Sequence, residues 1–171
     1  QHVAKFIQAQ AASLNSLKIC FYCATNFDSF DLCNTLPLLT NLEHLDVSEF
    51  RYIRDQVKFL KSVCHLPKMQ SIVLSVDYLE HFAEVIICIK NMKKLKYWQW
   101  NDVTVDLLLK YTSNFESCFL KLDHLKQVKF CEGGELSMKQ HLQKKLAAAL
   151  VQGAELCIFG EIIKGKRHVE K

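Results

Sequence analysis

A short apolar signature, L-x-x-L-x-L in its ideal form, recurs six times along the chain. Its apolar positions are Leu14-Leu17-Ile19, Leu42-Leu45-Val47, Met69-Ile72-Leu74, Met92-Leu95-Tyr97, Leu125-Val128-Phe130 and, in degraded form, Gly153-Leu156-Ile158. Measured between the middle positions, successive signatures are 28, 27, 23, 33 and 28 residues apart. A period of about 20 to 50 residues is typical of repeat proteins, in which stacked units bury a shared core.

The apolar spacing changes between strand-like and helix-like periods within each repeat. Alternation of apolar and polar residues in the signatures predicts short strands. Between the signatures, apolar residues recur every three or four positions, which predicts helices. Such faces are Ile53-Val57-Leu60-Cys64, Leu79-Phe82-Ile86-Ile89 and Met138-Leu142-Leu146-Ala149. Because a helical crossover joins strands in parallel, the sequence predicts an α/β right-handed solenoid, with parallel strands on its concave face and helices on its convex face.

The longest step, between Leu95 and Val128, leaves room for additional structure. We expect a helix over Val103–Tyr111, with Asp102 accepting hydrogen bonds from its first turn. An irregular turn over Thr112–Glu116 follows in this interpretation.

The composition is that of a folded domain. Half of the 171 residues are hydrophobic and 23% are charged, which argues against disorder. We expect a single domain of about five to six repeats over residues 1–171. Because the chain starts with Gln1 and enters a helical segment at once, we interpret it as a fragment of a longer protein. Residues 160–171 are expected to form a basic tail.

The net charge and the cysteine content indicate which partners and which cellular compartment to expect. The net charge of +4 and the sequence pI of ≈ 8.6 are mildly basic, below the pI of about 9 expected for a nucleic-acid-binding domain. Eight cysteines spread along the chain suit buried side chains in a reducing compartment. No stretch reaches the roughly 18 apolar residues of a membrane helix. We therefore expect a cytoplasmic or nuclear protein without membrane contact.

From Val3 to Phe159 the chain resembles leucine-rich-repeat proteins, and by unit length their ribonuclease-inhibitor-type subclass. The segments SLNSLKI, LPLLTNLEHLDVS, CHLPKMQSIVLSV and KLDHLKQVKF carry this resemblance. The family has Asn or Cys three residues after the last signature position, so this chain is an irregular member. It has other residues there, namely Tyr22, Phe50, Asp77, Trp100 and Gly133. The segment FIQAQAASLNSLKI followed by LPLLTNLEHLDVS is also similar to the repeat regions of F-box substrate receptors.

In a parallel repeat sheet, the residues that flank the inward positions point onto the concave face. We expect Lys94, Lys96, Trp98 and Lys129 to form a basic and aromatic patch there, with Trp100 at its border. Trp and basic side chains are typical of protein interfaces, so an acidic protein partner is predicted. The alternative is that Trp98 or Trp100 turns inward, because a one-residue shift of register exchanges the two faces. Further partner-binding residues expected on this face are His44, Asp46 and Ser71.

No motif favours catalysis or metal binding. Cys20 and Cys23 form a C-x-x-C pair, but a zinc site needs four ligands and no second pair is present. His44, Asp46 and Ser48 are the residue types of a catalytic triad, yet side chains two apart on one strand run parallel instead of converging. We expect neither an enzyme nor a bound cofactor.

The sequence thus predicts a non-enzymatic module that recognises a protein partner or substrate within a larger intracellular assembly, such as a ubiquitin ligase. Three alternatives remain open at this stage, and one is a structural role in which another part of the parent chain covers the concave face. Basic and aromatic residues 92–100 would suit a nucleic-acid-associated repeat domain, because such residues stack bases and contact phosphates. Innate-immune sensors also contain repeats of this length.

Overall fold

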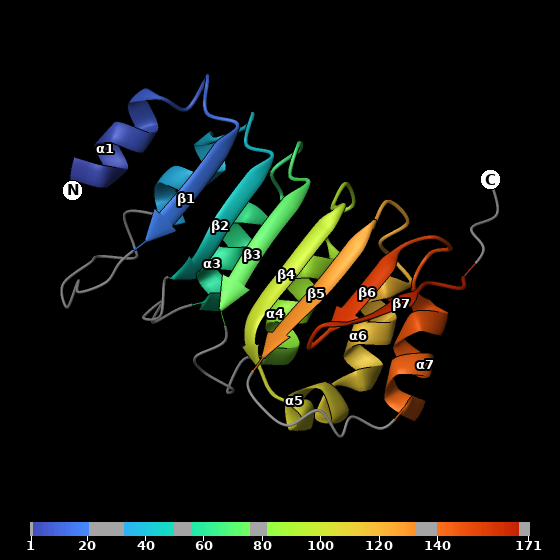
Figure 1. Cartoon of the computed structure of the whole chain (residues 1–171). Coiled ribbons are helices and arrows are strands. Elements are labelled where there is room, and N and C mark those ends of the chain that lie inside the picture. Colours follow the sequence, from blue (N-terminus) through green and yellow to red (C-terminus); the bar gives the residue numbers. More distant parts are fainter. Residues whose placement is uncertain (1, 21–32, 50–55, 76–81, 133–139, 168–171) are drawn as a thin grey trace.

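The computed structural model describes residues 2–20, 33–49, 56–75, 82–132 and 140–167. It is a mixed α/β fold with one open, mostly parallel sheet whose seven strands follow sequence order (Figure 1). The strands are β1 Ser16–Cys20, β2 His44–Glu49, β3 Ser71–Ser75, β4 Tyr97–Val103, β5 Gln127–Glu132, β6 Glu155–Ile158 and β7 Glu161–Lys164. The first six pair in parallel, and β7 pairs antiparallel with β6.

Helices cover one face of the sheet. They are α1 His2–Ala9, the 3-10 helix η1 Leu36–Leu38, α3 Gln56–Val63, α4 Phe82–Lys90, α5 Val105–Lys110, α6 Thr112–Phe119 and α7 Gln140–Ala149. Neighbouring helices in the series α3, α4, α6 and α7 contact one another behind the sheet (Figure 1). The described residues place no helix on the opposite face, which we call the open face. Among them, no helix has the length and apolarity needed to cross a membrane.

The strand register identifies the equivalent position in each repeat. Directly paired across the six parallel strands are Leu17, Leu45, Ile72, Trp98, Val128 and Leu156. These positions are 28, 27, 26, 30 and 28 residues apart, which is more regular than the spacing measured through Leu95. The predicted stacking is confirmed for Leu17, Leu45, Ile72 and Val128. It is wrong for Leu95, since the fourth signature is Leu95-Trp98-Trp100.

An aromatic cluster fills the core behind β4. The side chains of Trp98 and Trp100 are only 1% and 2% exposed. The Phe82 ring stacks on Trp100 with centroids 4.5 Å apart, and Phe115 lies 5.8 Å from Trp98. Neither indole N–H has a hydrogen-bond partner among the described residues. An unpartnered N–H costs about 1–3 kcal/mol, whereas burying some 200 Å² of aromatic surface contributes about 5 kcal/mol, so burial of the rings dominates.

The helices after β4 differ from the expectation. Thr104, and not Asp102, caps α5, since its side chain accepts a hydrogen bond from the Leu107 amide. Asp102 is instead the penultimate residue of β4, has a φ of 59° and accepts a hydrogen bond from the Ser75 hydroxyl. The expected irregular turn after Tyr111 is helix α6. Several predicted positions lie outside the described residues: Tyr22, Cys23, Phe50, Ile53, Asp77, Leu79, Gly133 and Met138.

Residues 160–167, expected as a basic tail, close the C-terminal end of the sheet. Strand β7 lies on β6, and the chain then crosses back over the end of α7. The Arg167 guanidinium is 2.9 Å from the Asp123 carboxylate and donates to the carbonyl oxygens of Phe119 and Ala149. Its side chain is 18% exposed, so Arg167 joins three segments of the fold. Residues 168–171 lie outside the described part of the chain.

Candidate functional site

The open face presents two rows of side chains that run across all seven strands. The first row contains Ser16, His44, Ser71, Tyr97, Gln127, Glu155 and Lys164. The second row contains Lys18, Asp46, Val73, Gln99, Lys129, Cys157 and Ile162. Because residues two apart on a strand point the same way, these rows form one continuous surface. Its charges are mixed and its central part is neutral.

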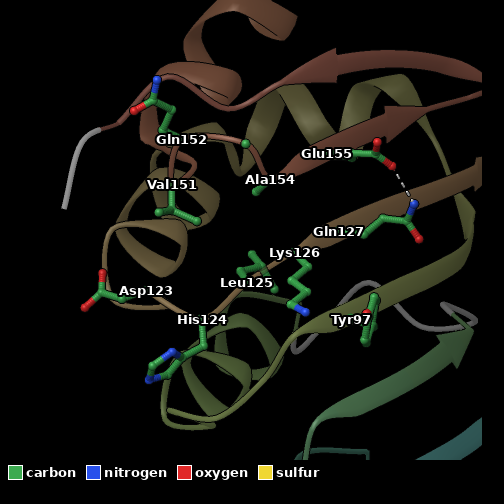
Figure 2. Close-up of a pocket in the computed structure, with 11 residues that line it drawn as sticks. Tyr97, Asp123, His124, Leu125, Lys126, Gln127, Val151, Gln152, Ala154 and Glu155 are labelled. Carbon is green, nitrogen blue, oxygen red and sulfur yellow. Dashed lines mark hydrogen bonds between the residues drawn. The ribbon is translucent and has the colours of Figure 1, made fainter.

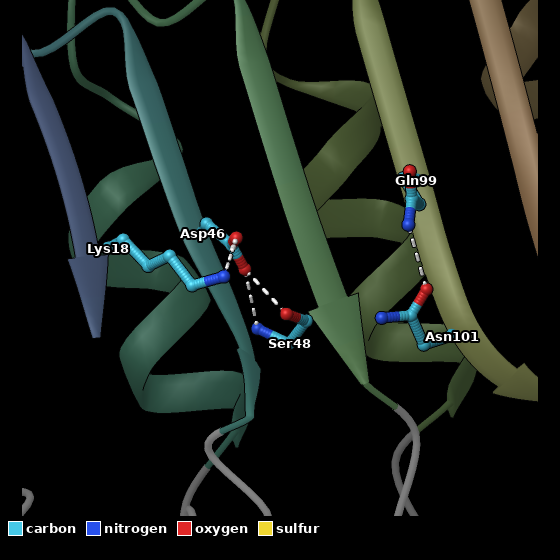
Figure 3. A network of polar contacts seen from close by, with 5 residues as sticks. All are labelled: Lys18, Asp46, Ser48, Gln99 and Asn101. Atoms are coloured by element: carbon cyan, nitrogen blue, oxygen red, sulfur yellow. Dashed lines mark hydrogen bonds and ion pairs between the residues drawn. The ribbon is translucent and has the colours of Figure 1, made fainter. Parts of the chain in front are cut away.

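A network of polar contacts links side chains of β1 and β2 on the open face (Figure 3). Lys18 Nζ lies 3.2 Å from one oxygen of the Asp46 carboxylate. The hydroxyl and amide of Ser48 donate to the other oxygen at 2.6 and 3.0 Å. Burial raises the pKa of Asp46, but the hydrogen bonds from Ser48 and the contact with Lys18 outweigh it and bring the pKa below its ordinary value of 3.8. Asp46 is therefore a charged and oriented group on this face.

Tyr97 is the large side chain at the centre of the open face. It is 43% exposed and lies between Ser71 and Gln127 in the first row. Further along β4, the Gln99 amide donates to the Asn101 side chain at 3.0 Å (Figure 3). Sequence reasoning missed Tyr97 as a contact residue, because it assigned this side chain to the interior. The more even spacing obtained with Trp98 as the inward residue is the signal that identifies it.

The β5 to β7 part of the face carries a second charged group. The Gln127 amide donates to the Glu155 carboxylate at 3.0 Å (Figure 2). Lys164 of β7 forms an ion pair with the same carboxylate. Lys164 and then Gln127 hold the pKa of Glu155 below its usual range. Lys129 lies on this part of the face too, between Gln99 and Cys157.

A hollow of about 600 Å³ adjoins the open face where β4, β5 and β6 begin (Figure 2). It is lined by Tyr97, Asp123, His124, Leu125, Lys126, Gln127, Val151, Gln152, Gly153, Ala154 and Glu155. Apolar side chains from the segments that precede β5 and β6, such as Leu125 and Val151, lie here beside polar side chains at the first residues of the strands. This combination suits an apolar side chain flanked by polar or charged ones.

The predicted basic and aromatic patch does not form. Trp98 and Trp100 point into the helix-covered core, because the strand register differs from the assumed one by an odd number of residues and so exchanges the two faces. Lys94 precedes β4, and Lys96 donates to the Gln70 side chain at 2.6 Å. Of the five patch residues, only Lys129 lies on the open face. The other expected contact residues, His44, Asp46 and Ser71, do lie on it.

The described residues offer little for catalysis or metal binding. They contain no group of three or more His, Cys, Asp or Glu side chains that could hold a metal ion. Ser48 donates its hydroxyl hydrogen to Asp46, whose pKa is lowered, and such a carboxylate is a weak base for activating a hydroxyl nucleophile. Burial raises the pKa of the Cys88 thiol to about 11 and that of Cys118 to about 12, which disfavours the nucleophilic thiolate.

The geometry thus provides a broad polar face with Tyr97 near its centre and a hollow at its edge. Comparisons with protein-family models, curated proteins and solved structures found no match for this chain.

Proposed function

We propose that the chain is a leucine-rich-repeat solenoid that binds a protein partner through the open face of its sheet. The observation that carries this proposal is the one-sided covering of the sheet. Helices bury the apolar side chains on one face, while two rows of mostly polar side chains remain accessible on the other. Binding proteins built from repeats use extended surfaces of this kind.

The face is suited to recognition because its side chains are arranged before a partner arrives. The ladder hydrogen bonds fix the strand backbones, and Asp46 and Glu155 are each held by neighbouring donors. Binding to such a surface costs little ordering entropy, so affinity depends on a few anchors. Tyr97 has the size and amphipathic character of an interface anchor. Asp46 and Lys129 would add charge selectivity on either side of it.

The nucleic-acid alternative loses two of the aromatic residues on which it depended. Trp98 and Trp100 are buried and cannot stack on bases from the open face. A protein partner fits the remaining mixture of one exposed aromatic ring, amides and paired charges better. Recognition of a substrate for a ubiquitin ligase is one form that this function would take.

Affinity capture from cell extract tests the proposal. A double variant, Tyr97→Ala with Lys129→Glu, changes the open face without touching a buried side chain. Lys144→Glu, an exposed position on α7, provides a control on the other side of the sheet. We expect specific partners to be lost with the double variant and retained with the control, with unchanged circular dichroism. Ligase subunits among the captured proteins would identify a substrate receptor. Equal capture by both variants would refute the open face as the interface.

A further inference from the structure

Six lysines gather at the edge of the sheet where the parallel strands begin. They lie in the return segments that precede β3, β4 and β5, and parallel strands bring such segments to the same edge (Figure 1). We call this surface the basic rim, and it consists of Lys68, Lys93, Lys94, Lys96, Lys121 and Lys126. Lys96 is half-buried, and the other five are exposed.

The charge of the basic rim is not neutralised within the described part of the chain. None of its six lysines forms an ion pair with a described residue. Lys68 and Lys96 donate instead to the neutral side chains of Asn41 and Gln70, at 2.7 and 2.6 Å. These bonds orient the ammonium groups and leave their full positive charge.

Two carboxylates near the basic rim are paired with cations outside it. Asp123 pairs with Arg167, and Glu155 is held by Lys164 and Gln127. A third, Glu43, keeps its charge, because its hydrogen bond comes from the neutral Gln70 amide, which also accepts from Lys96. The paired acids therefore leave most of the rim lysines available for an external anion.

Neighbouring repeats place like charges side by side. The Lys126 amide donates to the Lys96 carbonyl oxygen at 2.7 Å, so these two lysines occupy adjacent backbones. Adjacent strands are about 4.8 Å apart, and like charges at such spacing repel each other. An anionic ligand that lies along the basic rim would relieve this repulsion at several lysines at once.

The basic rim would also guide the approach of a partner. An acidic segment is attracted towards a basic surface, since complementary potentials set the direction of approach.

The hollow connects the basic rim with the open face. Lys126 and Tyr97 both line it, together with the apolar groups of Leu125, Val151 and Ala154 (Figure 2). A nucleic acid carries charge at every step and binds through successive stacking on aromatic rings, whereas the described residues around the hollow supply two separate rings, those of Tyr97 and His124. A polypeptide can place an apolar side chain in the hollow and carboxylates on either side of it.

We infer that the partner presents an extended acidic polypeptide segment, whose carboxylates contact the basic rim and whose apolar residue occupies the hollow. This inference rests on the proposed protein-binding role and specifies the chemistry of the partner. The contacts are exposed ion pairs, each individually weak, so affinity depends on several lysines acting together.

The test measures fluorescence anisotropy of a labelled oligoglutamate peptide that carries one central Phe, titrated with the full chain. The rim variant Lys93→Gln, Lys94→Gln and Lys126→Gln removes three charges. The control Lys5→Gln, Lys110→Gln and Lys144→Gln removes the same charge from exposed helical positions. We expect binding about tenfold weaker for the rim variant, since loss of about 1.4 kcal/mol from three ionic contacts corresponds to that factor. The control should stay within about twofold of the original chain, and a peptide without the Phe should bind more weakly.

Three results would overturn the inference. They are absence of peptide binding, equal weakening by the rim and control variants, and tighter binding of single-stranded oligouridylate than of the peptide. Failure here is distinguishable from failure of the proposed function, because the peptide assay uses purified components. Suppose that the open-face variant loses its cellular partners, but the unmodified chain does not bind the peptide. Then the inference of an acidic partner segment is refuted, and the proposed protein-binding function is not.

Discussion

The two faces of β4 differ sharply in burial. On one face, Trp98 and Trp100 lie in the aromatic cluster and are almost completely buried. On the other, Tyr97, Gln99 and Asn101 alternate with them and remain accessible to a partner. One segment of seven residues therefore contributes both the centre of the core and the centre of the proposed interface. The comparison predicts that substitutions on the first face affect stability and those on the second affect binding.

The largest expected effect is on the covered face. Trp98→Ala removes a ring that contacts Phe115, Phe119 and Phe130, and we expect it to lower the free energy of unfolding by about 3–5 kcal/mol. Urea denaturation followed by circular dichroism measures this. Trp98→Phe is the matched control, since it keeps an aromatic ring and removes the unpartnered N–H, and its cost should be clearly smaller. A loss below about 1 kcal/mol for the alanine variant would contradict the assigned burial.

A second experiment compares an ion pair on each side of the sheet. Arg167→Ala removes hydrogen bonds to two carbonyl oxygens and to Asp123 from a largely covered position, and should cost about 2 kcal/mol. Lys18→Ala removes a partner of Asp46 from a side chain that is 55% exposed, and should cost less than about 1 kcal/mol. Both values come from denaturation midpoints. Equal losses would remove the distinction between the covered and open sides.

A third experiment uses acid to examine the open face. Because the pKa of Asp46 is lowered in the folded chain, its contribution to stability is present above its ordinary value of 3.8 and is lost as the pH falls through the folded pKa. Asp46→Asn should therefore reduce the loss of stability between about pH 5 and pH 2, by less than about 1 kcal/mol. Ser48→Ala keeps the carboxylate and removes one donor, so its acid profile should be intermediate. An unchanged profile in Asp46→Asn would show that this network does not stabilise the fold.

The smallest stability effect is expected at the centre of the open face. Tyr97→Ala should change the free energy of unfolding by only about 0.5 kcal/mol, while it removes the proposed anchor for a partner. Thermal unfolding and affinity capture on the same preparation measure the two effects together. A large loss of stability would show that Tyr97 contributes to the core, and would contradict the prediction that the open face of β4 affects binding more than stability.

The sequence was sufficient to predict the parallel strands and most of their inward residues. Leu17, Leu45, Ile72 and Val128 pair directly because a repeated signature requires joint burial. It failed in the fourth repeat, where Leu95 belongs to two overlapping signatures, Met92-Leu95-Tyr97 and Leu95-Trp98-Trp100. Both contain only apolar or aromatic positions, so hydrophobicity alone cannot choose between them. The frames differ by three residues, and an odd shift exchanges the faces of a strand.

The candidate site depended on this choice and on contacts far apart in sequence. Placing Trp98 outward created a patch that does not exist and concealed Tyr97. The burial of Arg167 could not be foreseen either, because its acceptors Phe119, Asp123 and Ala149 come from other segments. In sequence, residues 160–171 contain one short apolar pair, Ile162-Ile163, within a mostly charged segment, which is equally consistent with a solvated tail.

The aromatic cluster also gives the chain a built-in spectroscopic reporter. Both tryptophans of the protein lie in it, so their fluorescence reports on the middle of the sheet and not on α1 or β7. In the proposed solenoid, terminal units can separate from the whole before the centre does. A fluorescence transition that lags behind the ellipticity transition would therefore reveal fraying from the ends, without any added label.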